Sequence, residues 1–207
     1  MRRDQRKSWD REYRLRGKLW RGELKENDIF EENLLPGLTL DNGCGNGKGT
    51  PSNADSVGLD FSIFALSIYS GNSKVLGDMT SLPFKDGKFS NVLFIHSLDH
   101  LDTGERASAL EEAARVLRED GKAVIRVFST DDFRYGKGLE TEPGTFLRGN
   151  KISTHYFTDD ELQGIPLFKL SKIYNINYTI NIHKKTFNRR ELIIILTKCK
   201  SENIRKY

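Results

Sequence analysis

The sequence predicts an α/β fold, a Rossmann-like doubly wound sheet of about seven strands that is mostly parallel and has an antiparallel C-terminal edge. Three observations lead to this prediction. Short apolar runs alternate with helical patterns between residues 38 and 128, a glycine-rich loop follows the first run, and two long strand patterns come last. The length of 207 residues suits a single domain with a buried core.

The central region alternates strands and helices, as a parallel sheet requires. Apolar runs predict strands at residues 37–40, 56–60, 74–77, 90–97 and 122–128. A helical pattern at residues 63–70 follows Ser62, a residue type that caps helices. The strongest helical pattern spans residues 101–121, where the start has capping-box spacing and Gly121 marks the expected stop.

Helical and strand patterns also flank this central region. Trp9, Tyr13 and Trp20 have helical spacing in a basic N-terminal segment, which predicts one helix or two short ones that either close over a bound ligand as a lid or are stapled to the sheet. A polar, glycine-bearing stretch with a short helix near residues 158–163 follows the fifth strand. A pair of long strands over residues 168–198 is the expected antiparallel edge.

The net charge of +4 is unevenly distributed. Residues 1–21 carry +6, residues 22–147 carry −9 and residues 148–207 carry +7. Such blocks are most often solvated faces. The alternative is that the two basic ends converge in space and grip a polyanion such as RNA.

Apolar run lengths and cysteine spacing indicate the compartment. No stretch approaches the 18 consecutive apolar residues of a membrane span, and the charged start MRRDQRKSWD is unlike a secretory signal. Cys44 and Cys199 lack metal-ligand spacing and are too few for a disulfide framework. We therefore expect a cytoplasmic protein without a metal site.

The stretch LDNGCGNGKG, residues 40–49, follows the first strand. Gly43, Gly45 and Gly47 permit positive φ values and close approach of a ligand to the backbone, and a helix behind them would offer unpaired amides. In a doubly wound sheet this loop lies where ligands bind. Asp60 ends the second strand, where a carboxylate can accept both ribose hydroxyls. The pattern favours a nucleoside-containing cofactor over a purely structural turn.

Two features favour S-adenosylmethionine over a dinucleotide. Pro51 leaves room for only a short helix after the glycine loop, whereas the dinucleotide fingerprint needs a full one. Asp78 ends the third strand and the tripeptide LPF follows, in the place where an adenine ring would be edged and covered.

Four stretches resemble successive motifs of the class I S-adenosylmethionine-dependent methyltransferases of the type 11-like group: LDNGCGNGKG, VGLDFS, GDMTSLPFKDGKFSNVLFIHSLDHL and EEAARVLREDGKAVI. The resemblance covers residues 38 to 128. It implies methyl transfer from S-adenosylmethionine. Two departures concern local packing: Ser90 stands where the family usually has Asp, and Asn42 replaces a common apolar residue.

The resemblance also implies the roles of individual residues and segments. The implied cofactor-binding residues are Asp41, Gly43, Cys44, Gly45, Asn46 and Gly47 around the methionine part, Asp60 at the ribose, Asp78 and Met79 along the adenine, Phe61 on the adenine face and His96 at the cofactor border. The expected parts of the domain are an N-terminal helical lid at 1–30, a cofactor-binding core at 38–128, an acceptor-site insert at 130–165 and a C-terminal strand pair at 168–198.

Methyl transfer from a sulfonium needs mainly alignment in a dry site, and a hydroxyl or protonated amine acceptor also needs a general base. The candidate bases are His96, Asp99, His100, Asp131, Asp132, His155 and Tyr156. We choose His100 as the catalytic residue, although a histidine after an apolar strand is more often a packing residue. The chain lacks the Asn/Asp-Pro-Pro-Tyr/Phe stretch of exocyclic-amine methyltransferases and a cysteine placed to attack a pyrimidine carbon.

Two acceptor classes remain open, and a third hypothesis is a non-catalytic S-adenosylmethionine-binding protein. The stretch GTFLRGNKISTHYFTDDEL resembles the insert that covers the acceptor in many small-molecule methyltransferases, which implies that Phe146, His155 and Tyr156 bind the substrate unless they belong to the core. GCGNGK and HLDTGERASALEEAARVLREDGKAVI resemble methyltransferases of the tRNA wobble carboxymethyl-uridine. We favour the small-molecule acceptor and keep the tRNA as the alternative; oligomeric state is left open.

Overall fold

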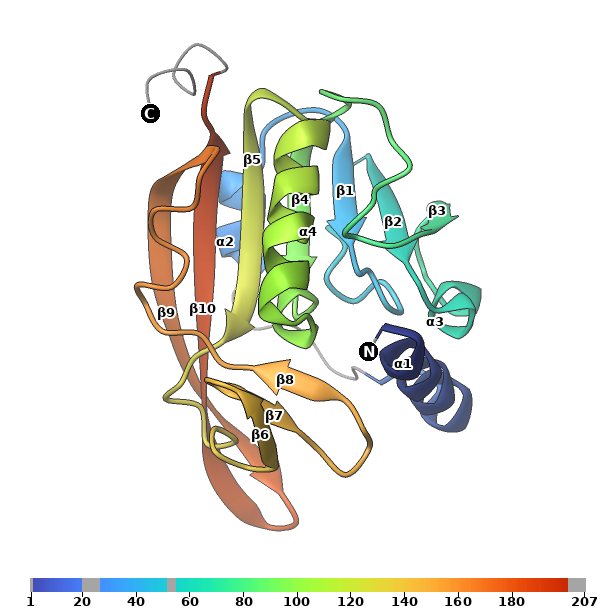
Figure 1. The fold of residues 1–207 in the computed structure, drawn as a ribbon, viewed down its shortest axis with the longest axis vertical. Coiled ribbons are helices and arrows are strands. Elements are labelled where there is room, and N and C mark those ends of the chain that lie inside the picture. The colour runs from blue at the N-terminus through green and yellow to red at the C-terminus, as the bar shows by residue number, and fades with distance from the viewer. Residues whose placement is uncertain (1, 20–26, 52–54, 201–207) are drawn as a thin grey trace.

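A seven-stranded sheet forms the centre of the computed structural model, which describes residues 2–19, 27–51 and 55–200. The strand order is β3-β2-β1-β4-β5-β10-β9 (Figure 1). The strands are β1 Thr39–Asn42, β2 Ser56–Asp60, β3 Ser73–Leu76, β4 Phe89–Ile95, β5 Leu117–Phe128, β9 Phe168–Ile182 and β10 Lys185–Lys198. The first five are parallel, and β10 runs antiparallel to both β5 and β9. The predicted fold class is confirmed.

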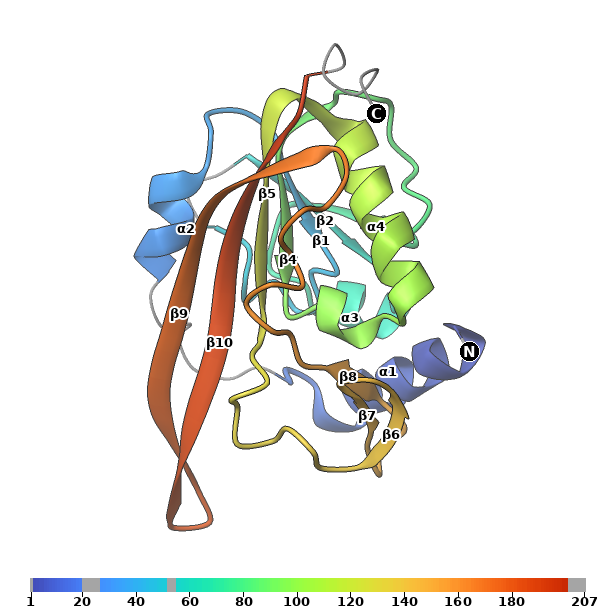
Figure 2. The same ribbon diagram turned by 60° about the vertical axis from the view of Figure 1, so that its left-hand side comes forward.

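Helices cover both faces of this sheet, with α4 on one face and α2 on the other (Figure 2). The helices are α1 Arg2–Arg16, α2 Asn27–Asn33, α3 Ile63–Ser67, the 3-10 helix η1 Leu98–His100 and α4 Thr103–Val116. A small antiparallel sheet in the order β6-β7-β8 lies beyond the carboxyl end of β5, near α1 (Figure 1). Its strands are β6 Leu139–Glu142, β7 Thr145–Leu147 and β8 Ser153–His155. Among the described residues, no helix has the length and apolar character needed to cross a membrane.

The predicted caps form, but α4 ends earlier than the sequence indicates. Asp102 and Glu105 make a reciprocal capping box, and the Ser62 side chain accepts a hydrogen bond from the Ala65 amide at the start of α3. The predicted stop at Gly121 is wrong, because the backbone becomes extended at Leu117 and enters β5 there. Leu117 is fully buried and pairs with Phe89 of β4, so sheet pairing outcompetes the last helical turn.

Two further expectations about helices are wrong. Residues 159–164 form turns instead of a helix, with short-range bonds such as the Gln163 amide to the Asp160 carbonyl. Between β1 and β2, the described residues 43–51 also form turns, so no helix lies directly behind the glycine loop there. The small sheet of residues 139–155 was not predicted, because its strands are only three or four residues long.

The core owes much of its apolar area to β10. Residues 192–196 are apolar and at most 1% exposed. Alternate side chains point to opposite faces of a strand, so Ile194 packs in the cluster beneath α4, whereas Ile193 and Ile195 pack in the cluster that contains Phe30 of α2. The last strand in the chain therefore joins the two layers of the core.

We expect Ile194→Ala to lower the free energy of unfolding by about 2–5 kcal/mol, the usual cost of truncating a large buried aliphatic side chain. Ile194 is fully buried and lies between Ile125 of β5 and Ile173 of β9. Urea unfolding followed by circular dichroism measures the change. The control is Leu139→Ala on β6, where the side chain is 68% exposed and the change should be small. Equal effects of the two substitutions would contradict this account of the core.

Candidate functional site

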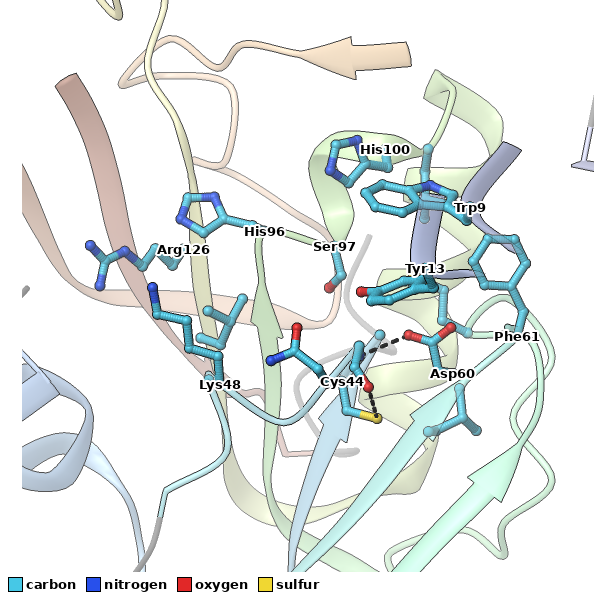
Figure 3. A pocket seen from close by; sticks show the side chains of 18 of the residues that line it. Trp9, Tyr13, Cys44, Lys48, Asp60, Phe61, His96, Ser97, His100 and Arg126 are labelled. Atoms are coloured by element: carbon cyan, nitrogen blue, oxygen red, sulfur yellow. Dashed lines mark hydrogen bonds between the residues drawn. The ribbon is translucent and has the colours of Figure 1, made fainter. Parts of the chain in front are cut away.

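A cavity of about 660 Å³ opens at the carboxyl ends of β1, β2 and β4, within the size range of small-molecule sites. α1 lies over one end of it, and strands β9 and β10 line the other (Figure 3). The topology accounts for this position, since the strand order reverses between β1 and β4. Residues far apart in sequence therefore meet here.

The glycine loop forms the floor of the cavity. The amides of Gly43 and Cys44 donate to the Leu59 carbonyl at 2.8 and 3.0 Å, which closes the loop onto the end of β2. Gly43 has φ +84°, and a Cβ there would collide with Ser97. Gly45 has φ +54°, and a Cβ there would collide with the Tyr13 hydroxyl. Gly43 and Gly45 have no room for side chains, because the facing wall lies directly against the loop backbone at these two positions.

Asp60 is held firmly at the end of β2. Its Oδ2 accepts a hydrogen bond from the Gly45 amide at 2.9 Å, and its Oδ1 accepts one from the Ser62 amide at 2.8 Å. Burial raises the pKa of Asp60 to about 6, although both amide bonds oppose the rise. Asp60 lines the cavity and is 5% exposed. The remaining lone pairs of this carboxylate are available to a ligand.

The cavity wall next to Asp60 contains both apolar and polar residues. It is formed by Phe61, Leu76, Gly77, Asp78 and Met79. Oδ1 of Asp78 accepts hydrogen bonds from the Thr80 amide and hydroxyl, both at 2.9 Å. A flat apolar surface beside fixed polar groups suits a purine ring.

Helix α1 covers this end of the cavity. The Trp9 and Tyr13 rings line it and lie 5.9 Å apart, and Trp9 contacts the His100 ring edge to face at 4.8 Å. The Ser62 hydroxyl donates to Asp10 at 2.5 Å, which links α1 to the start of α3. Burial raises the pKa of the Tyr13 hydroxyl. Trp20, the third residue of the predicted pattern, lies outside the described residues.

The opposite end of the cavity is lined by charged side chains. Nε of Arg126, on β5, lies 2.6 Å from an Oε of Glu191, on β10. The same Glu191 carboxylate lies 3.5 Å from the His96 ring and accepts the Tyr178 hydroxyl at 2.6 Å. Lys48 extends from the glycine loop toward Arg126 and His96 (Figure 3). All five residues line the cavity.

His96 occupies a strained position at the end of β4. It has φ +52°, a region that non-glycine residues rarely adopt and that is common at functional sites. Its ring stacks on Phe128 at 4.3 Å and lies 3.6 Å from Asp99. Burial lowers the pKa of His96, but the Glu191 and Asp99 carboxylates outweigh burial, and the pKa is raised overall. Burial likewise opposes ionisation of Glu191, yet His96 and Arg126 hold its pKa well below the usual range.

His100 lies between Trp9 at the α1 end of the cavity and His96 at the charged end (Figure 3). Its Nδ1 is 2.8 Å from the Ser153 carbonyl of β8, and because a carbonyl can only accept, Nδ1 carries the proton. Nε2 is buried, has no hydrogen-bond partner among the described residues, and lies 4.0 Å from a carboxylate oxygen of Asp99. The ring therefore has one nitrogen fixed by the backbone and the other available.

The cavity brings together most of the predicted site residues. Those that line it are Gly43, Cys44, Gly45, Asn46, Asp60, Phe61, Asp78, Met79, His96 and His100. Asp41 and Gly47 lie behind the loop: the Thr50 hydroxyl donates to Asp41, and Gly47 faces Tyr69 and Ser70. Burial raises the pKa of Asp41 to about 6. These two residues shape the loop, and the expectation that they contact the cofactor is not supported by the cavity.

The predicted substrate-binding residues lie elsewhere. Phe146 and Tyr156 pack with Phe128 in a buried cluster, and the Arg148 guanidinium donates to the Tyr156 hydroxyl. Nδ1 of His155 lies 2.7 Å from Thr145, and its Nε2 lies 2.6 Å from Glu161. None of the predicted three lines the cavity. Phe146 and Tyr156 instead form a small buried cluster with Phe128, and His155 is held by its polar neighbours.

Sequence reasoning missed the charged residues of the far end. Lys48, Arg126, Tyr178 and Glu191 line the cavity; Lys48 lies within the glycine-rich stretch but was given no role, and the other three belong to no local motif. One signal was present. Arg126 interrupts the apolar run KAVIRVF, and Glu191 precedes the run LIIIL. A charged residue inside a core strand needs a buried partner, so these two positions pointed to each other.

Comparisons with known proteins identify the core. Residues 40–125 match the family model described as a methyltransferase domain. The chain is 36% identical over 99 residues to the tRNA (carboxymethyluridine(34)-5-O)-methyltransferase of Xenopus tropicalis, covering 45% of this chain and 16% of that protein. It is 31% identical over 102 residues to a ubiquinone/menaquinone biosynthesis C-methyltransferase of Geotalea uraniireducens, covering 44% of this chain and 42% of that protein. The chain thus spans less than half the length of these relatives.

Solved structures share nearly the whole fold. The 1,6-didemethyltoxoflavin-N1-methyltransferase of Burkholderia thailandensis, with bound S-adenosylhomocysteine, superposes with a TM-score of 0.71 at 17% identity, covering 96% of this chain and 89% of that one. An S-adenosylmethionine-dependent methyltransferase of Methanosarcina mazei gives 0.67 at 19% identity, covering 86% and 99%. The predicted Rossmann-like doubly wound fold is confirmed.

S-adenosylhomocysteine is a suitable probe of Asp60. We expect its affinity to fall by about tenfold per pH unit below about pH 6, because the raised pKa of Asp60 lets a proton compete for the lone pairs that would accept the ribose hydroxyls. Isothermal titration calorimetry between about pH 7 and about pH 5 measures this dependence, since the ligand's own α-amino and α-carboxyl charges are constant over that range. Asp60→Asn should bind more weakly and lose the part of the pH dependence that Asp60 causes, leaving any contribution from Asp41, whose pKa is also raised to about 6. A flat profile for the unmodified protein would remove the ionised Asp60 carboxylate from the site.

Proposed function

We propose that the chain, whose residues 40–125 match the family model of a methyltransferase domain, transfers the methyl group of S-adenosylmethionine to an O, N or S nucleophile of a small molecule. The observation that carries this proposal is the cavity of about 660 Å³, which continues past the cofactor-like end to an end lined by charged side chains. A cofactor and a compact acceptor would share this volume.

The residues at the α1 end fit S-adenosylmethionine. Gly43 and Gly45 let the loop backbone lie directly against Ser97 and Tyr13 at the cavity wall, and Oδ1 of Asn46 is buried in that wall with no hydrogen-bond partner among the described residues. In the proposed arrangement this loop surrounds the methionine part, Asp60 holds the ribose, and Phe61 with Met79 packs on the adenine. α1 acts as the lid, through Trp9 and Tyr13.

S-adenosylmethionine supplies an electrophilic methyl group on a sulfonium. The chain aligns the acceptor with it and excludes water, which together provide most of the rate enhancement that such a displacement requires. Where the acceptor is a hydroxyl or a protonated amine, Nε2 of His100 removes its proton. The Ser153 carbonyl supports this role because it fixes the proton on Nδ1. Asp99, within 4.0 Å of Nε2, would stabilise the imidazolium that results.

One observation favours tRNA as the second candidate acceptor. The Xenopus relative is named for a methyl transfer to tRNA carboxymethyluridine. The tip of the β9–β10 hairpin, with exposed Lys184 and Lys185, lies at the same end of the sheet as the basic helix α1 (Figure 1). Such a surface would contact a phosphate backbone, and binding would then fall steeply with added salt.

Label transfer into a cell extract distinguishes the candidates. The extract is incubated with methyl-labelled S-adenosylmethionine and separated into RNA, protein and small-molecule fractions, with Asp60→Ala as the inactive control. We expect label in the small-molecule fraction, because the charged end of the cavity is enclosed by side chains of the chain itself. Label in RNA would establish the tRNA alternative. Cofactor binding without label in any fraction would indicate a non-catalytic S-adenosylmethionine-binding protein.

We expect His100→Ala to lower the turnover of the labelled acceptor by about 10²–10⁴-fold, the usual contribution of a general base, with the S-adenosylhomocysteine affinity nearly unchanged. Turnover and calorimetric affinity are measured on the same preparations. His183→Asn is the matched control, since this histidine is exposed in the turn between β9 and β10. Undiminished turnover of the His100 variant would show that the acceptor needs no base from this residue.

A further inference from the structure

The two ends of the cavity differ in charge. Near the glycine loop and α1 the ionisable groups of the wall include the carboxylates Asp60 and Asp78, together with the guanidinium of Arg6 on α1. At the far end the wall carries three groups of basic character, Lys48, His96 and Arg126, and one carboxylate, Glu191. In the arrangement proposed above, S-adenosylmethionine occupies the end of the cavity near the glycine loop and α1. Its positively charged sulfonium and the carboxylates around it then lie opposite the basic end.

The single carboxylate at the far end is fully engaged. Glu191 pairs with Arg126 at 2.6 Å, accepts the Tyr178 hydroxyl at 2.6 Å, and lies 3.5 Å from His96 and 3.7 Å from Arg189. Its oxygens are therefore surrounded by donors, and Glu191 is only 2% exposed. The negative charge of Glu191 is shared among several cations, so the basic character of this end is not cancelled.

At the far end of the cavity, Lys48 has no partner in the part of the chain that the structure describes. Among the described residues, no carboxylate lies within 4.0 Å of its ammonium and no hydrogen bond to it is formed, although it extends into the cavity toward Arg126 and His96 (Figure 3). Burial and the nearby Arg126 charge lower the pKa of Lys48, while Glu191 opposes them. A partly buried ammonium next to a guanidinium is costly unless an anion joins it.

We propose that this end of the cavity binds a carboxylate group of the methyl acceptor, with Lys48 as its direct ion-pair partner and Arg126 beside it. The inference rests on the proposed function and names the class of acceptor: a small molecule that carries a carboxylate. Attraction between this anion and the sulfonium is strong in a water-excluded cavity, and it orients the acceptor along the line between the two ends. Lys48 thus determines specificity, and His100 lines the same cavity.

The first test measures binding and needs no turnover. The protein is saturated with S-adenosylhomocysteine, and benzoate or hexanoate is titrated in, each beside its neutral amide, with ligand-observed NMR giving the dissociation constants. We expect each acid to bind about tenfold more tightly than its amide, and Lys48→Gln to abolish that difference. Lys88→Gln, at an exposed lysine, is the matched control. Acids that bind no better than their amides, or a preference for acids that Lys48→Gln leaves intact, would overturn the proposal.

The second test uses the natural acceptor. Small molecules of the extract are separated on an anion exchanger before the labelling reaction. We expect the acceptor in the retained fraction, and we expect Lys48→Gln to require about tenfold more of that fraction for equal label while its S-adenosylhomocysteine affinity is unchanged. An acceptor in the unretained fraction would overturn the carboxylate site and leave the methyltransferase proposal standing. Weaker S-adenosylhomocysteine binding by Lys48→Gln would assign Lys48 to the cofactor instead. Label in no fraction, with acid binding intact, would count against the proposed function alone.

Discussion

The ion pair between Arg126 and Glu191 is the interaction on which the charged end of the cavity depends. Both side chains are at most 2% exposed, and neither could be buried without the other, because an isolated charge in the interior costs several kcal/mol. The pair joins β5 to β10 across the antiparallel junction of the sheet. His96, Tyr178 and Arg189 then gather around the same carboxylate. One pair thus holds an entire polar network inside an otherwise apolar core.

A second constraint is the close packing around the glycine loop. Ser97 and Tyr13 come so near to Gly43 and Gly45 that side chains at these positions would displace them. The Ser97 hydroxyl also donates to the Asn42 carbonyl at 2.6 Å, so the loop after β1 and the turn after β4 are fixed relative to each other. The cofactor-like end and the charged end are consequently parts of one rigid wall.

Local patterns in the sequence were enough to locate most of the fold. The capping box at Asp102, the cap at Ser62 and the alternating apolar runs depend on neighbours a few residues apart, and they were located correctly. The end of α4 was not located correctly, because Leu117 pairs with Phe89 of β4. Local sequence rules do not contain a contact between such distant segments. The glycine loop and Asp60 were found because the spacing of the glycines, and the place of Asp60 at the end of a strand, follow from the local geometry of the backbone.

The far end of the cavity could not be derived in the same way. Arg126 and Glu191 are 65 residues apart, and although their places beside apolar runs indicate that each needs a buried partner, the local sequence does not give the distance or direction between them. Phe146 and Tyr156 look like aromatic walls of a pocket in the sequence, but the three-residue strands β7 and β8 bury them against Phe128 to form a small core. Whether an aromatic residue faces a cavity or a core depends on packing between segments, which the sequence pattern does not contain.

The place of β10 in the sheet has a consequence for biosynthesis. This strand follows all the others in chain order, yet it inserts between β5 and β9 and carries Glu191. Until it leaves the ribosome, β5 has an open edge and Arg126 has no carboxylate from β10 to neutralise it. The nascent chain therefore exposes both an unpaired strand edge and an uncompensated charge, and the sheet can close only after residues 185–198 have been made. Closure of the sheet and completion of the charged wall are thus a single late event during synthesis.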